Sequence, residues 1–196
     1  MAQRDSGFER ISGDRYFTPV WAAQPVVDFI TDRLFHPSDV IDPSAGAGHL
    51  LQPFIGSKSN VRGYDVDPDD SLGMVTLNRI VKRDTLLVPL SVTLGALIIM
   101  NPPYGERGKM AERFIRMAIG SGASLIAALL PVDFDSAKTR ASLFAQCPQF
   151  DAKIVLTTRI RWANVVQSSS SPSANHAWFI WDNARHTPSP RSYLYA

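Results

Sequence analysis

Short apolar runs alternate with segments of helical pattern along most of this chain, and no other feature constrains its fold as strongly. Residues 96–100 are apolar throughout, which is typical of a strand buried on both faces. Alternating strands and helices predict a parallel α/β sheet with helices on both faces. Strands are expected near 38–42, 61–65, 80–83, 96–100, 124–130, 152–158 and 174–182, and helices near 20–34, 50–55, 109–119 and 136–146.

The last two expected strands are not separated by a helical pattern, so they should form an antiparallel hairpin at one edge of the sheet. With 196 residues, of which 45% are hydrophobic, the chain can bury a proper core. We therefore expect a single domain over residues 1–183. The segment 184–196, which contains Pro, Ser and Arg, is expected to be a tail too short to bury a core.

Four residues, Asn101-Pro102-Pro103-Tyr104, follow the apolar run directly. The Asn101 side-chain oxygen and the Pro102 carbonyl could accept the two N–H groups of a planar amine. The two prolines make the turn rigid, and Tyr104 offers a ring face on which a heterocycle can stack. An ordinary Asn-Pro turn or a proline-motif ligand could have the same sequence. The position of these residues directly after a buried strand argues against an exposed linker.

A glycine loop, Asp42-Pro43-Ser44-Ala45-Gly46-Ala47-Gly48, follows the first expected strand. Gly46 and Gly48 let the backbone turn sharply and approach a ligand closely. Their spacing does not match the dinucleotide-binding fingerprint, and Asp42 would repel a pyrophosphate but suits a cationic or amine-bearing ligand. S-adenosylmethionine, which carries a sulfonium and an ammonium group, has this chemistry.

Acidic residues end the next two expected strands. Asp65 could accept hydrogen bonds from a ribose diol, with Asp67 as the alternative, and Asp84 could accept a bond from an adenine amine. Each acid alone would fit a helix cap or a solvated turn. Their order along the chain, after the glycine loop and before Asn101, is what predicts a nucleoside cofactor.

With these motifs in this order, the chain resembles the S-adenosylmethionine-dependent DNA adenine-N6 methyltransferases whose cofactor motifs precede the catalytic motif. The resemblance spans nearly the whole chain and implies a Rossmann-like sheet of seven mostly parallel strands. It also implies that residues 17–19 close over the methionine part of the cofactor. The implied cofactor residues are Phe17, Thr18, Pro19, Asp42, Ser44, Gly46, Gly48, Asp65, Asp84 and Asn101.

The reaction implied by the resemblance is direct methyl transfer to a flipped-out adenine stacked on Tyr104. The aromatic residue that packs against that base in the family falls on Trp162, which would equally fit an ordinary core tryptophan. Arg161 is the best candidate for a phosphate contact. DNA, duplex or single-stranded, is the expected partner, and short loops or a separate specificity protein would supply target recognition. The oligomeric state is left open.

Three alternatives share parts of this pattern. The first two are methyltransferases that act on RNA bases or on protein glutamine. Their substrates also carry a planar NH2 group, which an Asn-Pro-Pro-Tyr motif can bind in the same way. A non-catalytic subunit with the cofactor fold, binding nucleic acid or a partner enzyme, is the third. The early Phe17-Thr18-Pro19 segment and the late Arg161-Trp162 pair favour the DNA enzymes.

Composition excludes several other classes. The chain has a single cysteine, Cys147, so neither an internal disulfide nor a cysteine zinc site is expected. Its four histidines lack metal-ligand spacing, and we expect no metal. No apolar stretch of about eighteen residues occurs and the amino terminus is polar, so a cytoplasmic protein is expected.

The charge pattern is less decisive, because the net charge of +2 is too small to argue for nucleic acid. Lys109, Arg113 and Arg116 recur at helical spacing and would fit either phosphate contacts or a solvated helix face.

Overall fold

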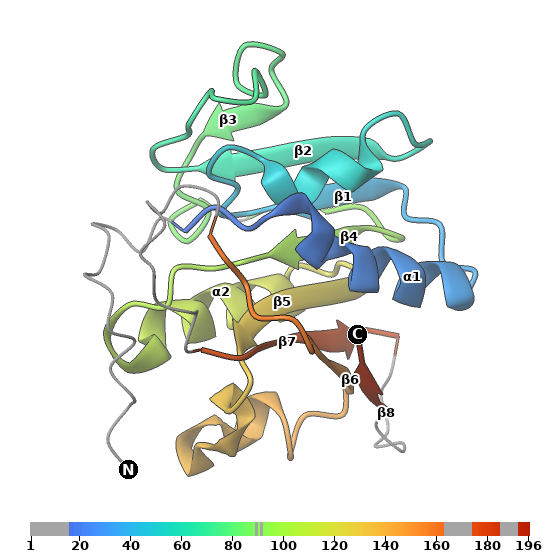
Figure 1. Cartoon of the computed structure of the whole chain (residues 1–196), viewed down its shortest axis with the longest axis vertical. Coiled ribbons are helices and arrows are strands. Elements are labelled where there is room, and N and C mark those ends of the chain that lie inside the picture. Colours follow the sequence, from blue (N-terminus) through green and yellow to red (C-terminus); the bar gives the residue numbers. More distant parts are fainter. Residues whose placement is uncertain (1–15, 89, 91, 163–173, 185–191) are drawn as a thin grey trace.

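The described residues form one eight-stranded sheet in the order β3-β2-β1-β4-β5-β7-β6-β8 (Figure 1). The computed structural model describes residues 16–88, 90, 92–162, 174–184 and 192–196. The strands are β1 (Asp39–Asp42), β2 (Asn60–Asp65), β3 (Ile80–Lys82), β4 (Leu97–Met100), β5 (Leu125–Pro131), β6 (Phe150–Val155), β7 (His176–Asp182) and β8 (Ser192–Tyr195). The α-helices are α1 (Gln24–Asp32) and α2 (Lys109–Gly120), and the 3-10 helices are η2 (Val20–Ala23), η3 (His49–Phe54), η4 (Glu106–Gly108), η5 (Phe134–Ser136) and η6 (Lys138–Leu143).

The first five strands pair in parallel, and β7 runs antiparallel to both β5 and β6. The predicted α/β sheet with an antiparallel hairpin is therefore confirmed. The sheet has eight strands rather than seven, because β8, which lies in the expected tail, pairs in parallel with β6. That pairing is made by backbone groups, which the Pro-, Ser- and Arg-containing composition of the tail does not reveal.

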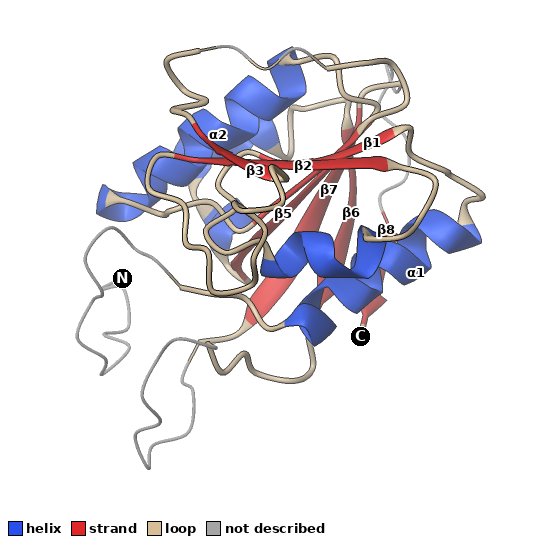
Figure 2. Ribbon diagram, turned by 90° about the horizontal axis from the view of Figure 1, so that it is seen from above, coloured by secondary structure: helices blue, strands red, loops and turns tan. Residues whose placement is uncertain are grey.

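Helices cover both faces of the sheet, and successive strand residues point into two separate cores. Figure 2 shows α1 on one face and α2 on the other. Val40 packs in the core that contains Val26 of α1, whereas Ile41 packs in the core that contains Ile115 of α2. The continuous apolar run of β4 is needed because its residues alternate between these two cores.

Two buried tryptophans of β7 fasten segments on opposite faces of the sheet. The indole N–H of Trp178 donates to the carbonyl of Ala22 at 2.7 Å, and that of Trp181 donates to the carbonyl of Leu143 at 2.7 Å. Both side chains are fully buried, so these bonds satisfy donors that water cannot reach. Trp178 thereby fixes η2, the element that directly follows residues 16–19.

Of the four predicted helices, the one over 109–119 is confirmed as α2, whereas the other three are divided or of the 3-10 type. The expected helix over 20–34 is divided into η2 and α1, because Pro25 lies at the start of α1, where its missing N–H is tolerated. The segment expected at 50–55 is a 3-10 helix that contains Pro53. The segment expected at 136–146 is interrupted by the extended backbone of Ala137, which leaves η5 and η6. Within the described residues, no helix is long and apolar enough to cross a membrane.

Strand β6 is displaced from its expected position, and this affects the site. It ends at Val155 rather than at residue 158. Thr157 instead donates its backbone N–H to the carbonyl of Ala196 at 2.5 Å. Arg161 and Trp162 lie in the loop after β6.

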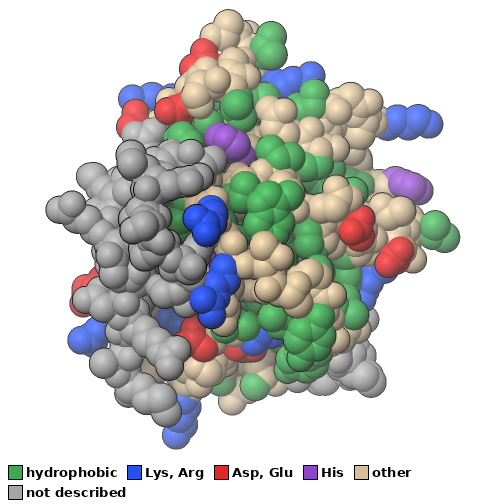
Figure 3. All heavy atoms as spheres, viewed as in Figure 1, with side chains coloured by type: hydrophobic (Ala, Val, Ile, Leu, Met, Phe, Trp, Pro, Cys, Tyr) green, Lys and Arg blue, Asp and Glu red, His purple; other side chains and the backbone are tan. Residues whose placement is uncertain are grey.

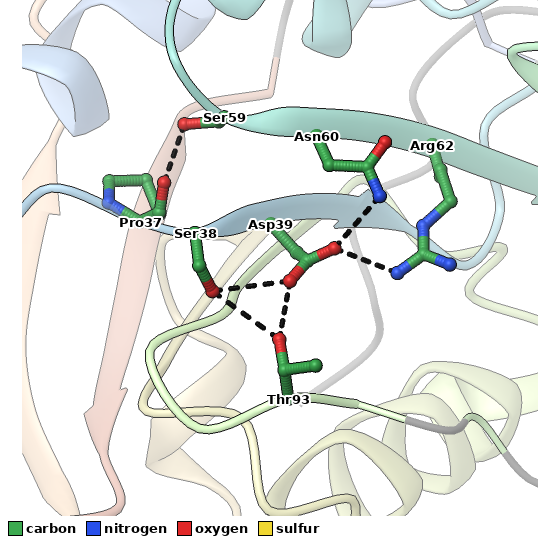
Figure 4. Close-up of polar contacts among 7 residues, drawn as sticks. All are labelled: Pro37, Ser38, Asp39, Ser59, Asn60, Arg62 and Thr93. Carbon is green, nitrogen blue, oxygen red and sulfur yellow. Dashed lines mark hydrogen bonds and ion pairs between the residues drawn. The ribbon is translucent and has the colours of Figure 1, made fainter.

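The amino end of the sheet is held by a buried carboxylate, Asp39 (Figure 4). Asp39 accepts hydrogen bonds from Asn60 at 3.1 Å and Arg62 at 2.8 Å, both on β2, and from Thr93 in the loop before β4. The Thr93 hydroxyl is the main cause of a lowered pKa at Asp39. The network ties β1, β2 and the approach to β4 together at the end of the sheet opposite the candidate site.

Candidate active site

A cavity of about 370 Å³ opens where β1, β2, β3 and β4 end. Its volume lies in the range of sites that hold small organic ligands. Ligands bind at this edge in open α/β sheets, because the loops that follow parallel strands meet there. The lining is Tyr16, Phe17, Thr18, Asp42, Pro43, Ser44, Ala45, Gly46, His49, Leu50, Asp65, Val66, Asp67, Arg83, Asp84, Thr85, Asn101, Pro103 and Phe114.

The glycine loop is clamped by Asp65 at the end of β2. One carboxylate oxygen of Asp65 accepts the N–H of Gly46 at 2.8 Å, and the other accepts the N–H of Asp67 at 2.9 Å. Gly46 has φ +53° and lies against the ring of Phe17, so a side chain there would be strained and crowded. Asp65 thus shapes the loop, and the second lone pair of each oxygen leaves capacity for the predicted ribose contact.

Asp42 is the most perturbed acid of the cavity. It is 2% exposed, and burial raises the pKa of its carboxyl to about 8. The nearby Asp65 carboxylate adds to this rise, whereas the backbone N–H of Ser44, which donates to Asp42 at 2.9 Å, opposes it. Among the residues that the structure describes, none of the causes that shift this pKa is a cationic side chain, so Asp42 is well suited to an ammonium group from a ligand.

Asp84 also lies in the cavity, in the turn after β3. Its carboxylate accepts the N–H of Leu86 at 2.9 Å. The neighbouring Thr85 is buried and donates its hydroxyl to the carbonyl of Pro43 at 3.0 Å, which ties this turn to the glycine loop.

The structure brings most of the predicted cofactor residues into one lining. Those that line the cavity are Phe17, Thr18, Asp42, Ser44, Gly46, Asp65, Asp84 and Asn101. Of the described residues that were predicted, Pro19 and Gly48 are not part of the lining. Gly48 has φ +90° and packs tightly on Ile80 and Met74, so it supports the loop from behind. Direct cofactor contacts of Pro19 and Gly48 stay predictions.

A second, much smaller pocket adjoins the first. It is lined by Tyr16, Asn101, Pro102, Tyr104 and Trp162, and its volume of about 10 Å³ holds about one water molecule. The rings of Tyr16 and Trp162 are in contact, with centroids 5.4 Å apart. Asn101 and Tyr16 line both pockets. The predicted substrate residues Tyr104 and Trp162 are therefore brought together beside Asn101.

The amide of Asn101 has a defined orientation. Its Nδ2 donates to Thr18 Oγ1 at 3.0 Å and to the carbonyl of Tyr16 at 3.3 Å. A carbonyl can only accept, so the amide nitrogen must face Tyr16 and the amide oxygen must face away. The Tyr104 hydroxyl donates to that oxygen at 3.4 Å, a weak bond.

His176, the first residue of β7, backs the small pocket. Its ring meets the Trp162 ring edge-on at a centroid distance of 5.2 Å. Burial lowers the pKa of His176 to about 4, with a backbone hydrogen bond to Ala174 acting in the opposite direction. The ring is therefore neutral at physiological pH.

The predicted phosphate contacts lie on the surface beside this pocket. Arg161 is exposed, as is Arg159, which donates to the side chain of Asn175 at 2.9 Å. Figure 3 shows basic side chains next to apolar ones on the face of the molecule that is seen in Figure 1. Lys109, Arg113 and Arg116 are exposed on α2, as their spacing indicated. Their roles stay predictions.

Several lining residues were not identified from the sequence as site residues, and Phe114 and Tyr16 are two of them. Phe114 reaches the cavity from α2, where its apolar character fits the helix core face and gives no sign of a ligand. Tyr16 lines both pockets. The sequence feature that could have indicated this role is its position as an aromatic residue directly before residues 17–19. Among the residues that the structure describes, no group of three or more His, Cys, Asp or Glu side chains is arranged to hold a metal ion.

Comparisons with known proteins place this geometry in a fold class. No protein-family model matches the chain, and no curated protein matches it. Among solved structures, a protein from Pyrococcus horikoshii assigned as an RNA methyltransferase aligns with a TM-score of 0.62 at 14% identity, over 91% of both chains. A modification subunit assigned to a type I restriction enzyme of Vibrio vulnificus YJ016 aligns with a TM-score of 0.59 at 17% identity, over 94% of this chain and 48% of the subunit.

A third neighbour was solved with its cofactor. Magnesium protoporphyrin IX methyltransferase from Synechocystis PCC 6803, with bound S-adenosylmethionine, aligns with a TM-score of 0.55 at 11% identity, over 83% of this chain and 79% of that enzyme. The chain therefore has the class I, Rossmann-like methyltransferase fold, and it spans about half the length of the modification subunit. S-adenosyl-L-methionine is the cofactor bound in the last of these neighbours.

Proposed function

We propose that this protein transfers a methyl group from S-adenosyl-L-methionine to the exocyclic N6 amine of adenine in DNA. The observation that carries the proposal is the place of Asn101, between a ligand-sized cavity and a small pocket walled by three aromatic rings. A methyl donor in the first and a flat base in the second would meet at this residue. The DNA substrate is supported by the modification-subunit neighbour and by the Asn-Pro-Pro-Tyr motif.

The large cavity suits the cofactor by its chemistry as well as by its size. Asp42 is a buried acid that an ammonium group would pair, and the Gly46 turn leaves room for close approach of a ligand. When bound, the cofactor supplies a methyl group already activated by a sulfonium. Phe17, Thr18, Ser44, Asp65 and Asp84 would complete its surroundings, since all five line the cavity.

The small pocket suits the acceptor amine. The Asn101 oxygen and the Pro102 carbonyl would accept the two amine N–H groups and aim the nitrogen toward the cavity. Tyr104 would stack on the base, and Trp162 would flank it. The amine lone pair forms the new N–C bond as the S–C bond breaks, and one amine proton leaves to solvent. No covalent bond to the protein is required.

Entry of a base must separate Tyr16 from Trp162, because a pocket of about 10 Å³ cannot hold a heterocycle. Flipping a base out of a duplex costs a few kcal/mol, and less from a single strand. We therefore include both strand states among the test substrates.

The experiment is transfer of labelled methyl groups to unmethylated duplex DNA, single-stranded DNA, RNA and a protein extract in parallel, followed by mass analysis of the products. We expect N6-methyladenine in DNA, and loss of at least a hundredfold in the Asn101→Ala variant with cofactor binding retained. Asn60→Ala, which removes an amide at the opposite end of the sheet, is the matched control and should keep its transfer rate. Full activity of Asn101→Ala would refute the proposed chemistry.

RNA is the second candidate substrate, and one observation favours it. The RNA methyltransferase neighbour matches over 91% of both chains, whereas the chain covers only 48% of the modification subunit. Label that appears in RNA adenines alone would assign the activity to RNA. Cofactor binding without transfer to any substrate would favour a subunit that requires a specificity partner.

A further inference from the structure

The amide of Asn101 is useful for the proposed reaction in only one of its two orientations. With the oxygen toward the substrate pocket it accepts an amine N–H, whereas after a half-turn of the side-chain amide it would present its own N–H groups to that amine. Two donors facing each other cannot bond, so the reaction requires a device that fixes this amide.

The carbonyl of Tyr16 can only accept, so it selects this orientation, and the Thr18 hydroxyl, which can accept or donate, holds the amide nitrogen in place. They supply two acceptors to Nδ2 of Asn101, at 3.0 Å and 3.3 Å, from a segment more than 80 positions away in the chain. Thr18 is 3% exposed, so water cannot easily replace its hydroxyl. Its position is itself held, because Pro19 accepts the N–H of Ala22, whose carbonyl is bonded to the buried Trp178.

We propose that Thr18 is a positioning residue that fixes the Asn101 amide for methyl transfer, an inference that rests on the proposed function. The hydroxyl oxygen of Thr18 acts through Asn101 and does not touch the amine. The contact with the cofactor expected of residues 17–19 is a separate role, which the Thr18 methyl group and backbone can fulfil. The two roles make different kinetic predictions.

The test is a double-mutant cycle with Thr18→Val and Asn101→Ala. Valine has nearly the shape of threonine but lacks the acceptor, so one amide N–H of Asn101 is left without a partner. We expect kcat to fall about tenfold to a hundredfold in Thr18→Val, while the Kd for S-adenosylmethionine changes less than threefold. Thr18→Ser, which restores the acceptor, should recover most of kcat.

The decisive arm is the double variant. If Thr18 acts through Asn101, adding Thr18→Val to Asn101→Ala should cost nothing further. Single-turnover assays with labelled methyl groups keep such slow variants measurable. Additive losses in the double variant, or a wild-type kcat in Thr18→Val while Asn101→Ala is inactive, would overturn the inference alone. Full activity of Asn101→Ala would instead defeat the proposed function.

A fold control separates positioning from stability. Thr93→Val removes a threonine-to-Asp39 bond at the other end of the sheet, so it should lower the melting temperature and leave kcat unchanged. If Thr18→Val does not fold, Thr18→Ala takes its place in the cycle. A fall of kcat in Thr93→Val as large as in Thr18→Val would show that general loosening accounts for the effect, and would also overturn the inference.

Discussion

Replacing Asp42 by asparagine should make the cofactor-free protein more stable at alkaline pH. Asp42 is buried at the end of β1, and burial raises its pKa from 3.8 to about 8. Because the folded pKa lies above the unfolded value, the carboxyl favours the fold below about pH 4, and this contribution is lost as the pH rises toward 8. An asparagine of the same shape carries no such dependence.

The interval between 3.8 and about 8 corresponds to at most about 6 kcal/mol, at 1.36 kcal/mol for each pH unit. Relaxation of the glycine loop and entry of water reduce such penalties, so we expect about 2–4 kcal/mol. The quantity to measure is the difference in the free energy of unfolding between wild type and Asp42→Asn in urea, from pH 5 to pH 9. His49 and His176 titrate in both proteins, so their effects cancel in the difference.

A cofactor product supplies the second half of the test. S-adenosylhomocysteine carries the ammonium group, whereas methylthioadenosine lacks the whole amino-acid part. We expect the first compound to stabilise the wild type more at pH 8 than at pH 6, because its ammonium pairs with the ionised Asp42, and the second to show no such rise. A pH dependence of unfolding that is equal in wild type and Asp42→Asn would refute the reasoning.

Three further predictions concern the loop, the pocket and the opposite end of the sheet. Gly48→Ala should cost about 2–5 kcal/mol of stability in a urea titration, because Gly48 has φ +90° and a Cβ there would lie 2.9 Å from the Ile80 side chain. Gly56→Ala is the control, because Gly56 has φ +82° but open space around it, and it should cost only about 1–2 kcal/mol. Tyr104→Ala should raise KM for nucleic acid about tenfold to a hundredfold through lost stacking, and Tyr104→Phe should leave KM within about threefold; equal effects of both would contradict a stacking role. Asp39, whose pKa is lowered, should stabilise the fold above pH 3.8 and lose that contribution in acid, so the melting temperatures of wild type and Asp39→Asn should differ at neutral pH and converge in strong acid.

The sheet could be predicted because each strand has a local signature. Residues 97–100 are apolar on both faces, and acids or amides end β1, β2 and β4, which marks the edge where a ligand binds. The place of β7 between β5 and β6 could not be predicted, since hydrophobic runs carry no information on strand order. Strand β8 was missed because its residues are mostly exposed, so it lacks the buried apolar pattern that marks the central strands.

Individual site residues could be predicted from the sequence, but the contacts between them could not. The residues before α1 and the motif after β4 were both identified, yet the bond between Thr18 and Asn101 joins positions 83 apart. Trp162 follows β6 in the chain and lies outside the sheet, and its contact with Tyr16 at the pocket could not be read from the strand pattern. Such contacts arise from tertiary packing, which local patterns do not contain.

The shared wall between the two pockets has a consequence for inhibitor chemistry. Asn101 and Tyr16 line both, so the cavity of about 370 Å³ and the small aromatic pocket lie on either side of the same two residues. A single compound that joins an adenosyl amino acid to a second purine by a short linker would occupy both, once Tyr16 and Trp162 separate as they must for a base. Binding of one half would raise the effective concentration of the other, so a modest affinity at each pocket would combine into tight binding.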